Sequence, residues 1–195
     1  FEFLDGYHAQ ADKNNLPTKE QAYTAGRALA SMHEIGNTFK SSTFRSRNVF
    51  MELERVLQNE HIFKKDFEGG EVFVAQVKKS LEFSKKNKSL IGLIHNDYRV
   101  GNVFFKNDND VSGVIDFDWS CIGPIMKDIA LSVLEWSYPD VRTEPDFLVF
   151  DAFLNGYNSV SKQKYTKGKE LYFWIMFVAL SDASTFSVTD YPHLN

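Results

Sequence analysis

The spacing of apolar residues over the first half of the chain is typical of amphipathic helices. In residues 16–36, Thr18 followed three positions later by Gln21 forms a capping box, the pattern of a helix N-terminus. The apolar side chains of this segment recur on one helical face, at Ala22, Ala25, Leu29 and Met32. The sequence therefore predicts a helix in this segment.

Two further helices are predicted by the same spacing. The first covers residues 48–63, with apolar positions at Val49, Leu53, Val56 and Leu57. The second covers residues 69–88, with apolar positions at Val72, Phe73, Val77, Leu81 and Phe83. Each series falls on one helical face, as expected of a helix that packs against a core.

The pattern then changes to short runs of β-branched and aromatic residues. These runs cover residues 90–95, 102–106 and 111–118, and an Asn-Asp-Asn-Asp turn separates the last two. Such runs on either side of a turn predict a small β-hairpin. Beyond the Gly-Pro pair at 123–124 the helical spacing returns, over residues 125–136, 146–159 and 167–186.

These elements predict an α+β fold that is predominantly helical, with one short hairpin. No repeat, low-complexity tract or evident linker divides residues 1–195, so we expect one structural unit. The sequence starts with an apolar alternation typical of a strand and with Phe1 in place of a methionine. That start fits a chain which begins within a longer protein.

Composition restricts the partners of this unit. The chain has 195 residues, 43% of them hydrophobic and 25% charged, as is usual for globular proteins. A net charge of −4 provides no basic field for a phosphate backbone, so we expect small-molecule partners and no nucleic acid. Cys121 is the single cysteine, which excludes an internal disulfide and fits a cytoplasmic protein. No apolar run is long enough to predict a membrane span.

Three polar residues interrupt the strand-like run LIHNDYRVGNVFFK, at His95, Asp97 and Asn102. Asp116 stands fourteen residues beyond Asn102, at the end of the next strand-like run, so a hairpin would bring these two side chains together. Phosphoryl transfer needs magnesium held by hard oxygen ligands, and a carboxylate that orients the attacking hydroxyl and accepts its proton. Asn102 and Asp116 suit the metal, and Asp97 suits the hydroxyl.

Two segments resemble the aminoglycoside phosphotransferase and choline kinase superfamily, which has a protein-kinase-like fold. Residues 95–102, with the sequence HNDYRVGN, are similar to the HxDxxxxN catalytic loop of this family. Residues 114–130, with the sequence VIDFDWSCIGPIMKDIA, are similar to a family segment in which an IDxE/D motif is followed by a Gly-Pro pair and then by a DLA motif. The resemblance implies that Asp97 is the catalytic base, supported by His95 as a loop-bracing histidine. It also implies that Asn102 and Asp116 bind magnesium and that Asp128 braces the loop from the following helix.

Two of these residues also have simpler interpretations. His95 fits a hydrogen-bonded core histidine without any part in proton transfer. Asp128 fits an exposed acid that stabilises a helix N-terminus through the helix dipole. Two weaker segments extend the resemblance: residues 26–36 are similar to the helix after the hinge of these kinases, and residues 1–6 to the hinge itself.

The resemblance further implies ATP as the phosphoryl donor and magnesium as the cofactor. Residues 1–195 would then be the C-terminal lobe, with the hairpin carrying the catalytic loop. The chain has no glycine-rich loop in a phosphate-binding context, since Gly69 and Gly70 precede a helix. We therefore expect the N-terminal nucleotide lobe to lie outside this chain, in cis or as a separate fragment. We expect the chain alone to be inactive or nearly so.

The acceptor is less constrained by the sequence. Candidates for contact with it, or for support of the site, are Asp118, Trp119, Glu135 and Trp136. Aromatic rings and carboxylates together can bind an ammonium group. However, aromatic residues at helical spacing are more often core residues. A choline-like, homoserine-like or aminoglycoside-like alcohol therefore remains open as the acceptor.

Other functions compete with a small-molecule kinase. A pseudokinase or a nucleotide- or small-molecule-binding module would keep the loop without transferring phosphate. A metal-dependent hydrolase would need a second acidic cluster to hold two metals, and only Asp116 and Asp118 are close in sequence. A protein kinase is disfavoured because the sequence after Asp116 enters a helix quickly, without an evident activation loop.

Overall fold

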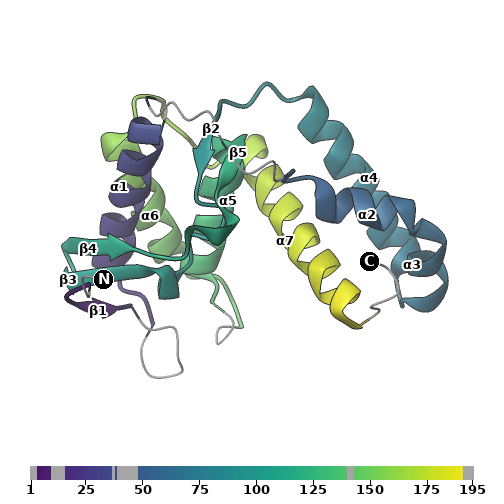
Figure 1. The fold of residues 1–195 in the computed structure, drawn as a ribbon, viewed down its shortest axis with the longest axis horizontal. Helices are drawn as coiled ribbons and strands as arrows, with labels where there is room; N and C mark the ends of the chain where they lie inside the picture. Colours follow the sequence, from purple (N-terminus) through teal and green to yellow (C-terminus); the bar gives the residue numbers. More distant parts are fainter. Residues whose placement is uncertain (1–3, 10–15, 37, 39–47, 140–142, 191–195) are drawn as a thin grey trace.

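The computed structural model describes residues 4–9, 16–36, 38, 48–139 and 143–190. The helices within these ranges are α1 (Lys19–Gly36), α2 (Met51–Gln58), α3 (Glu60–Asp66), α4 (Gly70–Lys86), α5 (Ile125–Ser137), α6 (Phe147–Val160) and α7 (Lys169–Asp190). The strands are β1 (Tyr7–His8), β2 (Ile91–Ile94), β3 (Val103–Asn107), β4 (Asp110–Val114) and β5 (Cys121–Pro124). The predicted α+β fold, mostly helical, is confirmed (Figure 1).

Helix α1 begins as its sequence predicts. The backbone N–H of Gln21 donates to Thr18 Oγ1 at 3.1 Å, and the backbone N–H of Thr18 donates to Gln21 Oε1 at 3.0 Å. This reciprocal capping box satisfies two donors that a helix N-terminus would otherwise leave unpaired. Helix α6 is capped in a related way, because the Asp146 carboxylate accepts the backbone N–H of Leu148 at 2.9 Å.

The single helix predicted over residues 48–63 is wrong, because two helices form there. Asn59 separates α2 from α3 with a non-helical backbone (φ −114°), and its side-chain amide donates to the Arg55 carbonyl at 3.0 Å. The asparagine side chain thus competes with the helical hydrogen bonds, as this residue often does. Helix α4 forms as predicted, but it buries Val74 and leaves Val72 66% exposed.

The β-structure is more extensive than the one predicted hairpin. β3 and β4 form that hairpin, and β1 pairs antiparallel with the other edge of β3. β5 was not predicted as a strand; it pairs antiparallel with β2, from Ile91 opposite Pro124 to Ile94 opposite Cys121. A four-residue strand gives little periodic signal, and its pairing partner lies some thirty residues earlier in the chain.

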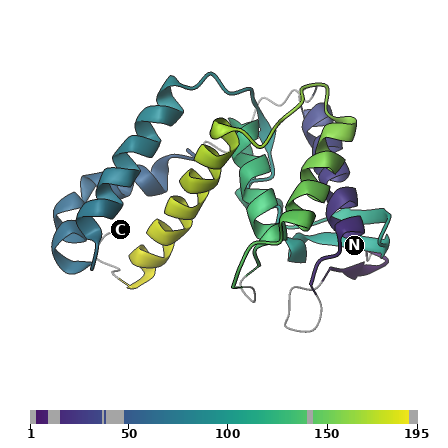
Figure 2. The ribbon, with the colours of Figure 1, turned by 180° about the vertical axis from the view of Figure 1, so that it is seen from behind.

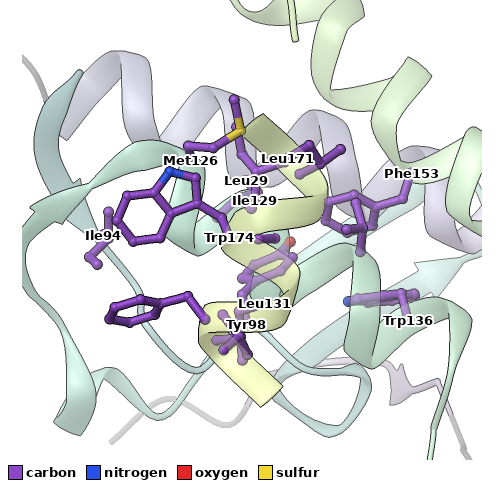
Figure 3. Packing of buried hydrophobic residues seen from close by; sticks show 14 of the residues in the cluster. Leu29, Ile94, Tyr98, Met126, Ile129, Leu131, Trp136, Phe153, Leu171 and Trp174 are labelled. Atoms are coloured by element: carbon purple, nitrogen blue, oxygen red, sulfur yellow. The ribbon is translucent and has the colours of Figure 1, made fainter. Parts of the chain in front are cut away.

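Helices α5 and α7 pack against each other near the middle of the molecule. On one side of this pair lie α6, α1 and the β3–β4 hairpin, and on the other lie α2, α3 and α4 (Figures 1 and 2). The buried apolar side chains form one cluster that includes Trp136 and Trp174 (Figure 3). Among the helices that the structure describes, none combines the length and hydropathy that crossing a bilayer would require.

Candidate active site

The segment from His95 to Asn102, called the catalytic loop below, begins where strand β2 ends. Asp128, in the first turn of α5, holds its start: the carboxylate accepts the backbone N–H of His95 at 2.9 Å and that of Asn96 at 2.8 Å. Asn96 has a left-handed backbone (φ 65°), which asparagine tolerates better than most residues. The turn at the start of the loop is therefore fixed by one buried carboxylate.

Asp128 is fully buried, which agrees with the predicted brace and not with an exposed helix-terminal acid. Its carboxylate also contacts His33 Nε2 at 2.9 Å, and His33 Nδ1 lies 2.7 Å from the Tyr157 hydroxyl. Burial acts to raise the pKa of Asp128, but His33 and the two loop N–H groups outweigh it and hold that pKa below its usual value. The loop is thereby connected to α1 and α6.

His95 is buried and both of its ring nitrogens contact backbone groups. The backbone N–H of Asp97 donates to His95 Nδ1 at 3.3 Å, so Nε2 carries the proton and donates to the Ile115 carbonyl at 3.0 Å. The ring therefore joins the catalytic loop to the end of β4. This geometry supports the bracing role and leaves no ring nitrogen for proton transfer to a substrate.

Asp97 lies at the centre of the loop and is 9% exposed. Its Oδ2 accepts the side-chain amide of Asn102 at 3.0 Å, and its Oδ1 accepts Arg99 Nε at 2.7 Å. Arg99 also places a terminal nitrogen 2.6 Å from Oδ1. A carboxylate has about four lone-pair positions, so these three contacts orient the group and leave room for an acceptor hydroxyl. Arg99 was not predicted as a site residue. Its position two residues after Asp97 was the one sequence feature that could have indicated this pairing.

Asn102 and Asp116 lie at the base of the β3–β4 hairpin, where the pairing of the two strands brings their backbones close together. The Ile115 backbone N–H donates to the Asn102 carbonyl at 3.0 Å, so Asp116 directly follows the residue that pairs with Asn102. Asp116 has a left-handed backbone (φ 63°) and is exposed. The Asn102 side-chain nitrogen donates to Asp97, which leaves its oxygen as the group available to a cation.

These two residues fit a magnesium ion by the chemistry of their donors. Mg²⁺ prefers oxygen ligands and is usually held by one or two carboxylates, with waters and substrate phosphates completing its coordination. Within the described ranges, no group of three or more His, Cys, Asp or Glu side chains could hold a metal. A hydrolase with two metals held by clustered carboxylates therefore gains no support.

A cleft of about 260 Å³ opens beside Asp97. Helices α2, α5 and α7 and the catalytic loop line it, with Asn48, Val49, Glu52, Asn96, Asp97, Arg99, Trp119, Lys127, Leu131, Glu135, Ser181, Asp182 and Thr185. Trp119 and Glu135, two of the candidates for acceptor contact, thus line the cleft. Asp118 is exposed and lies outside this lining.

Trp136 does not reach the cleft, and it is removed from the acceptor candidates. Its side chain is fully buried, with ring centroids 6.2 Å from Phe105 and 5.9 Å from Phe153. Figure 3 shows Trp136 and Phe153 among the core side chains. Adjacent helical residues point in directions about 100° apart, so Glu135 faces the cleft while Trp136 faces the core.

Besides Arg99, three charged residues of the cleft were missed by sequence reasoning: Glu52, Lys127 and Asp182. Burial lowers the pKa of the Lys127 ammonium, although the neighbouring carboxylates Asp128 and Asp182 act against this. Partial burial by the cleft walls raises the pKa of Asp182, and Lys127 acts to lower it. The Asp182 side chain still reaches solvent. No spacing in the sequence indicated them, because they come from three separate helices.

The comparisons with known proteins agree with this geometry. A family described as the phosphotransferase enzyme family matches residues 1–171. A homoserine kinase from Gluconobacter oxydans is 30% identical over 179 residues, covering 74% of this chain and 56% of its own length. One from Brucella anthropi is 33% identical over 153 residues, covering 74% of this chain and 44% of its own length. The chain spans about half the length of the curated relatives that it matches.

Solved structures share the fold at lower identity. An amicoumacin kinase in complex with AMP-PNP and Ca²⁺ superposes with a TM-score of 0.70 at 12% identity, over 94% of this chain and 55% of its own. An ethanolamine kinase from Plasmodium vivax superposes with a TM-score of 0.61 at 17% identity, over 94% and 55% of the two chains. At such identities the likeness establishes the protein-kinase-like fold alone.

Proposed function

This chain belongs to the phosphotransferase enzyme family, and from that premise we propose that the protein transfers the γ-phosphoryl group of ATP to the hydroxyl of a small molecule. One observation carries the proposal. The Asp97 carboxylate is held by Asn102 and Arg99 at the edge of a cleft large enough for a small alcohol. The homoserine kinases among its relatives and the ethanolamine kinase that shares its fold act on small molecules, as their names say.

In the proposed reaction, the acceptor hydroxyl lies against Asp97. Its oxygen forms a bond to the γ-phosphorus as the bond from that phosphorus to the bridging oxygen of ATP breaks, and ADP leaves. Asp97 orients the hydroxyl and accepts its proton. Asn102 and Asp116 would hold magnesium, which neutralises charge on the phosphate oxygens when bound. His95 and Asp128 position the loop without touching the reacting atoms.

Residues 1–195 would provide the acceptor side of this reaction. We propose that a nucleotide lobe, in cis or as a separate fragment, completes the active enzyme. Phosphoryl transfer depends on the exact position of the ATP phosphates, and the phosphate-covering loop and lysine of that lobe would hold them in place. A cytoplasmic location stays a prediction.

Substitution of Asp97 by asparagine in the full-length protein tests the proposal. The asparagine has nearly the same shape but cannot accept the hydroxyl proton, so we expect kcat to fall by about 10²- to 10⁴-fold. The measurement is ADP release with magnesium and ATP across a panel of small hydroxyl compounds. Asp66→Asn is the matched control, because Asp66 ends α3 on the exposed surface.

One outcome would count against a kinase, and another against Asp97 as its catalytic base. If ATP binds but no acceptor turns over in the wild type, a pseudokinase or binding module becomes the better description. If turnover occurs but Asp97→Asn leaves its rate within about twofold of the wild type, phosphotransfer stands and Asp97 is not the base.

A further inference from the structure

The cleft contains charged residues that the proposed chemistry does not use. Lys127 comes from α5, Glu52 from α2 and Asp182 from α7. Asp97 and Arg99 already pair with each other, which leaves Lys127 as the remaining cation of the cleft lining, among the carboxylates of Glu52, Glu135 and Asp182. A binding site that holds both signs of charge beside an alcohol-activating aspartate restricts which acceptors can fit it.

Lys127 is the more unusual of these residues, because it is only 7% exposed. An ammonium group has three N–H donors, and within the described ranges Lys127 uses one of them, on the Asn96 side-chain oxygen. A buried charge without enough partners is costly. The carboxylates of Asp128 and Asp182 already supply opposite charge nearby, and a carboxylate on a bound ligand would supply the missing acceptors in a charge-assisted hydrogen bond.

The carboxylates of the cleft would be stabilised by a positively charged group on the ligand. In the part of the chain that the structure describes, Asp182 makes no hydrogen bond or ion pair. Burial is the main cause of its raised pKa; Asp97 and Glu52 add to it, while Lys127 and Arg99 act in the opposite direction. Repulsion among neighbouring carboxylates is relieved when a cation binds between them. A ligand ammonium would do so, and Glu52 and Asp182 reach the cleft from its α2 and α7 walls.

The size of the cleft limits the acceptor further. Its volume of about 260 Å³ is smaller than the roughly 300–1,000 Å³ of sites for drug-sized ligands. An acceptor of a few carbon atoms fits such a space better than an aminoglycoside.

Resting on the proposed function, we propose that the acceptor is a small hydroxy amino acid whose carboxylate binds Lys127 and whose ammonium group binds Asp182 and Glu52. Its hydroxyl then points to Asp97. Lys127 and Asp182 are specificity-determining residues in this arrangement, and neither takes part in proton transfer.

The test uses the full-length protein and four probes that differ in charge alone or nearly so. Homoserine carries both charges, 3-amino-1-propanol lacks the carboxylate, 4-hydroxybutanoate lacks the ammonium group, and 1-propanol lacks both. We expect kcat/KM for homoserine to exceed that of each other probe by at least about 100-fold, since each lost charge leaves a buried or crowded protein charge unpaired.

Charge-removing variants then assign the two contacts. Lys127→Met should raise KM for homoserine by about 10- to 100-fold, and by at least about tenfold more than it raises KM for 3-amino-1-propanol. Asp182→Asn should raise KM for homoserine at least about tenfold more than it raises KM for 4-hydroxybutanoate. Lys79→Met is the matched control, because Lys79 is exposed on α4. Thermal unfolding of each variant shows whether it is folded.

The outcomes separate this inference from the proposed function. If 3-amino-1-propanol or choline turns over as well as homoserine in the wild type, the inference fails while phosphotransfer stands. If Lys127→Met lowers kcat equally for every acceptor, Lys127 contacts the phosphoryl group and the inference is also wrong. If no compound on either panel is phosphorylated, the proposed function itself fails.

Discussion

Asp128 is the residue on which the geometry of the site depends most. Its carboxylate accepts two backbone N–H groups of the catalytic loop and contacts His33 of α1, without exposure to solvent. A buried carboxylate is tolerated only when its charge and lone pairs are satisfied in this way. The loop that carries Asp97 is thus fixed by a residue of the following helix.

Substitution of Asp128 by asparagine should destabilise the protein by about 3–5 kcal/mol, because it leaves the partners of a buried charge unmatched. Asp151→Asn is the control, since Asp151 pairs with Lys167 at the surface, where an ion pair contributes at most about 1 kcal/mol. The free energy of unfolding in urea measures both effects.

The effect of Asp128 on stability should also depend on pH. Its pKa is lower in the folded protein than its ordinary value, so the ionised carboxylate stabilises the fold above the unfolded pKa of about 3.9. That contribution is lost as the pH falls through the lower, folded pKa. The difference in unfolding free energy between wild type and Asp128→Asn should therefore be largest near neutral pH and shrink below about pH 4. A difference that stays constant into strong acid would contradict the ionised brace.

At the scale of elements, two glycines set the distance between α1 and α6. A Cβ atom on Gly26 would lie 2.1 Å from the Phe153 carbonyl oxygen, and one on Gly156 would lie 1.9 Å from the Tyr23 carbonyl oxygen. Both obstacles are backbone atoms of the facing helix, so neither can move aside alone. This close packing keeps His33 of α1 within reach of both Asp128 and Tyr157.

Gly156→Ala should therefore destabilise the protein although alanine favours helix by about 1 kcal/mol. Overpacking typically costs about 1–3 kcal/mol, and occasionally more, and separation of two helix backbones belongs at the upper end of that range. We expect a net loss of about 2 kcal/mol in the free energy of unfolding. Gly168→Ala is the control, since its Cβ would meet its nearest atom at an ordinary 3.5 Å. Equal stability of the two variants would show that α1 and α6 can shift apart without cost.

At the scale of the whole molecule, the described residues share one continuous core. One buried cluster extends from Leu53 of α2 through Ile129 of α5 to Leu29 of α1. A continuous core favours cooperative unfolding. The acceptor cleft lies where α2, α5 and α7 come together, so it depends on this core and not on one element.

Residues 1–195 expressed alone should accordingly unfold in one cooperative transition and yet give no acceptor-dependent ADP release. The reason for inactivity is positioning: the chain spans about half the length of the homoserine kinases that it matches, and phosphoryl transfer depends on fixed nucleotide phosphates. Calorimetry and a coupled ADP assay measure the two properties. A magnesium-dependent rate that tracks this chain and is lost in Asp97→Ala would overturn the prediction of inactivity.

Features that depend on nearby residues could be predicted from the sequence. Helix α1 starts at a capping box of Thr18 and Gln21, and the hairpin turns at an Asn/Asp cluster, because these signals act over three or four positions. The motifs around Asp97 and Asp116 were visible for the same reason. The predicted buried aspartate, Asp128, was identified by a resemblance and not by periodicity.

The set of side chains that share the cleft depends on long-range packing and could not be predicted from local sequence. Glu135 and Trp136 are neighbours in sequence, yet one lines the cleft and the other lies in the core. The pairing of β2 with β5 and the meeting of Lys127 with Asp182 join segments that are far apart in the chain. Such contacts depend on how helices and strands pack against one another, and packing is set by the whole core rather than by the local sequence.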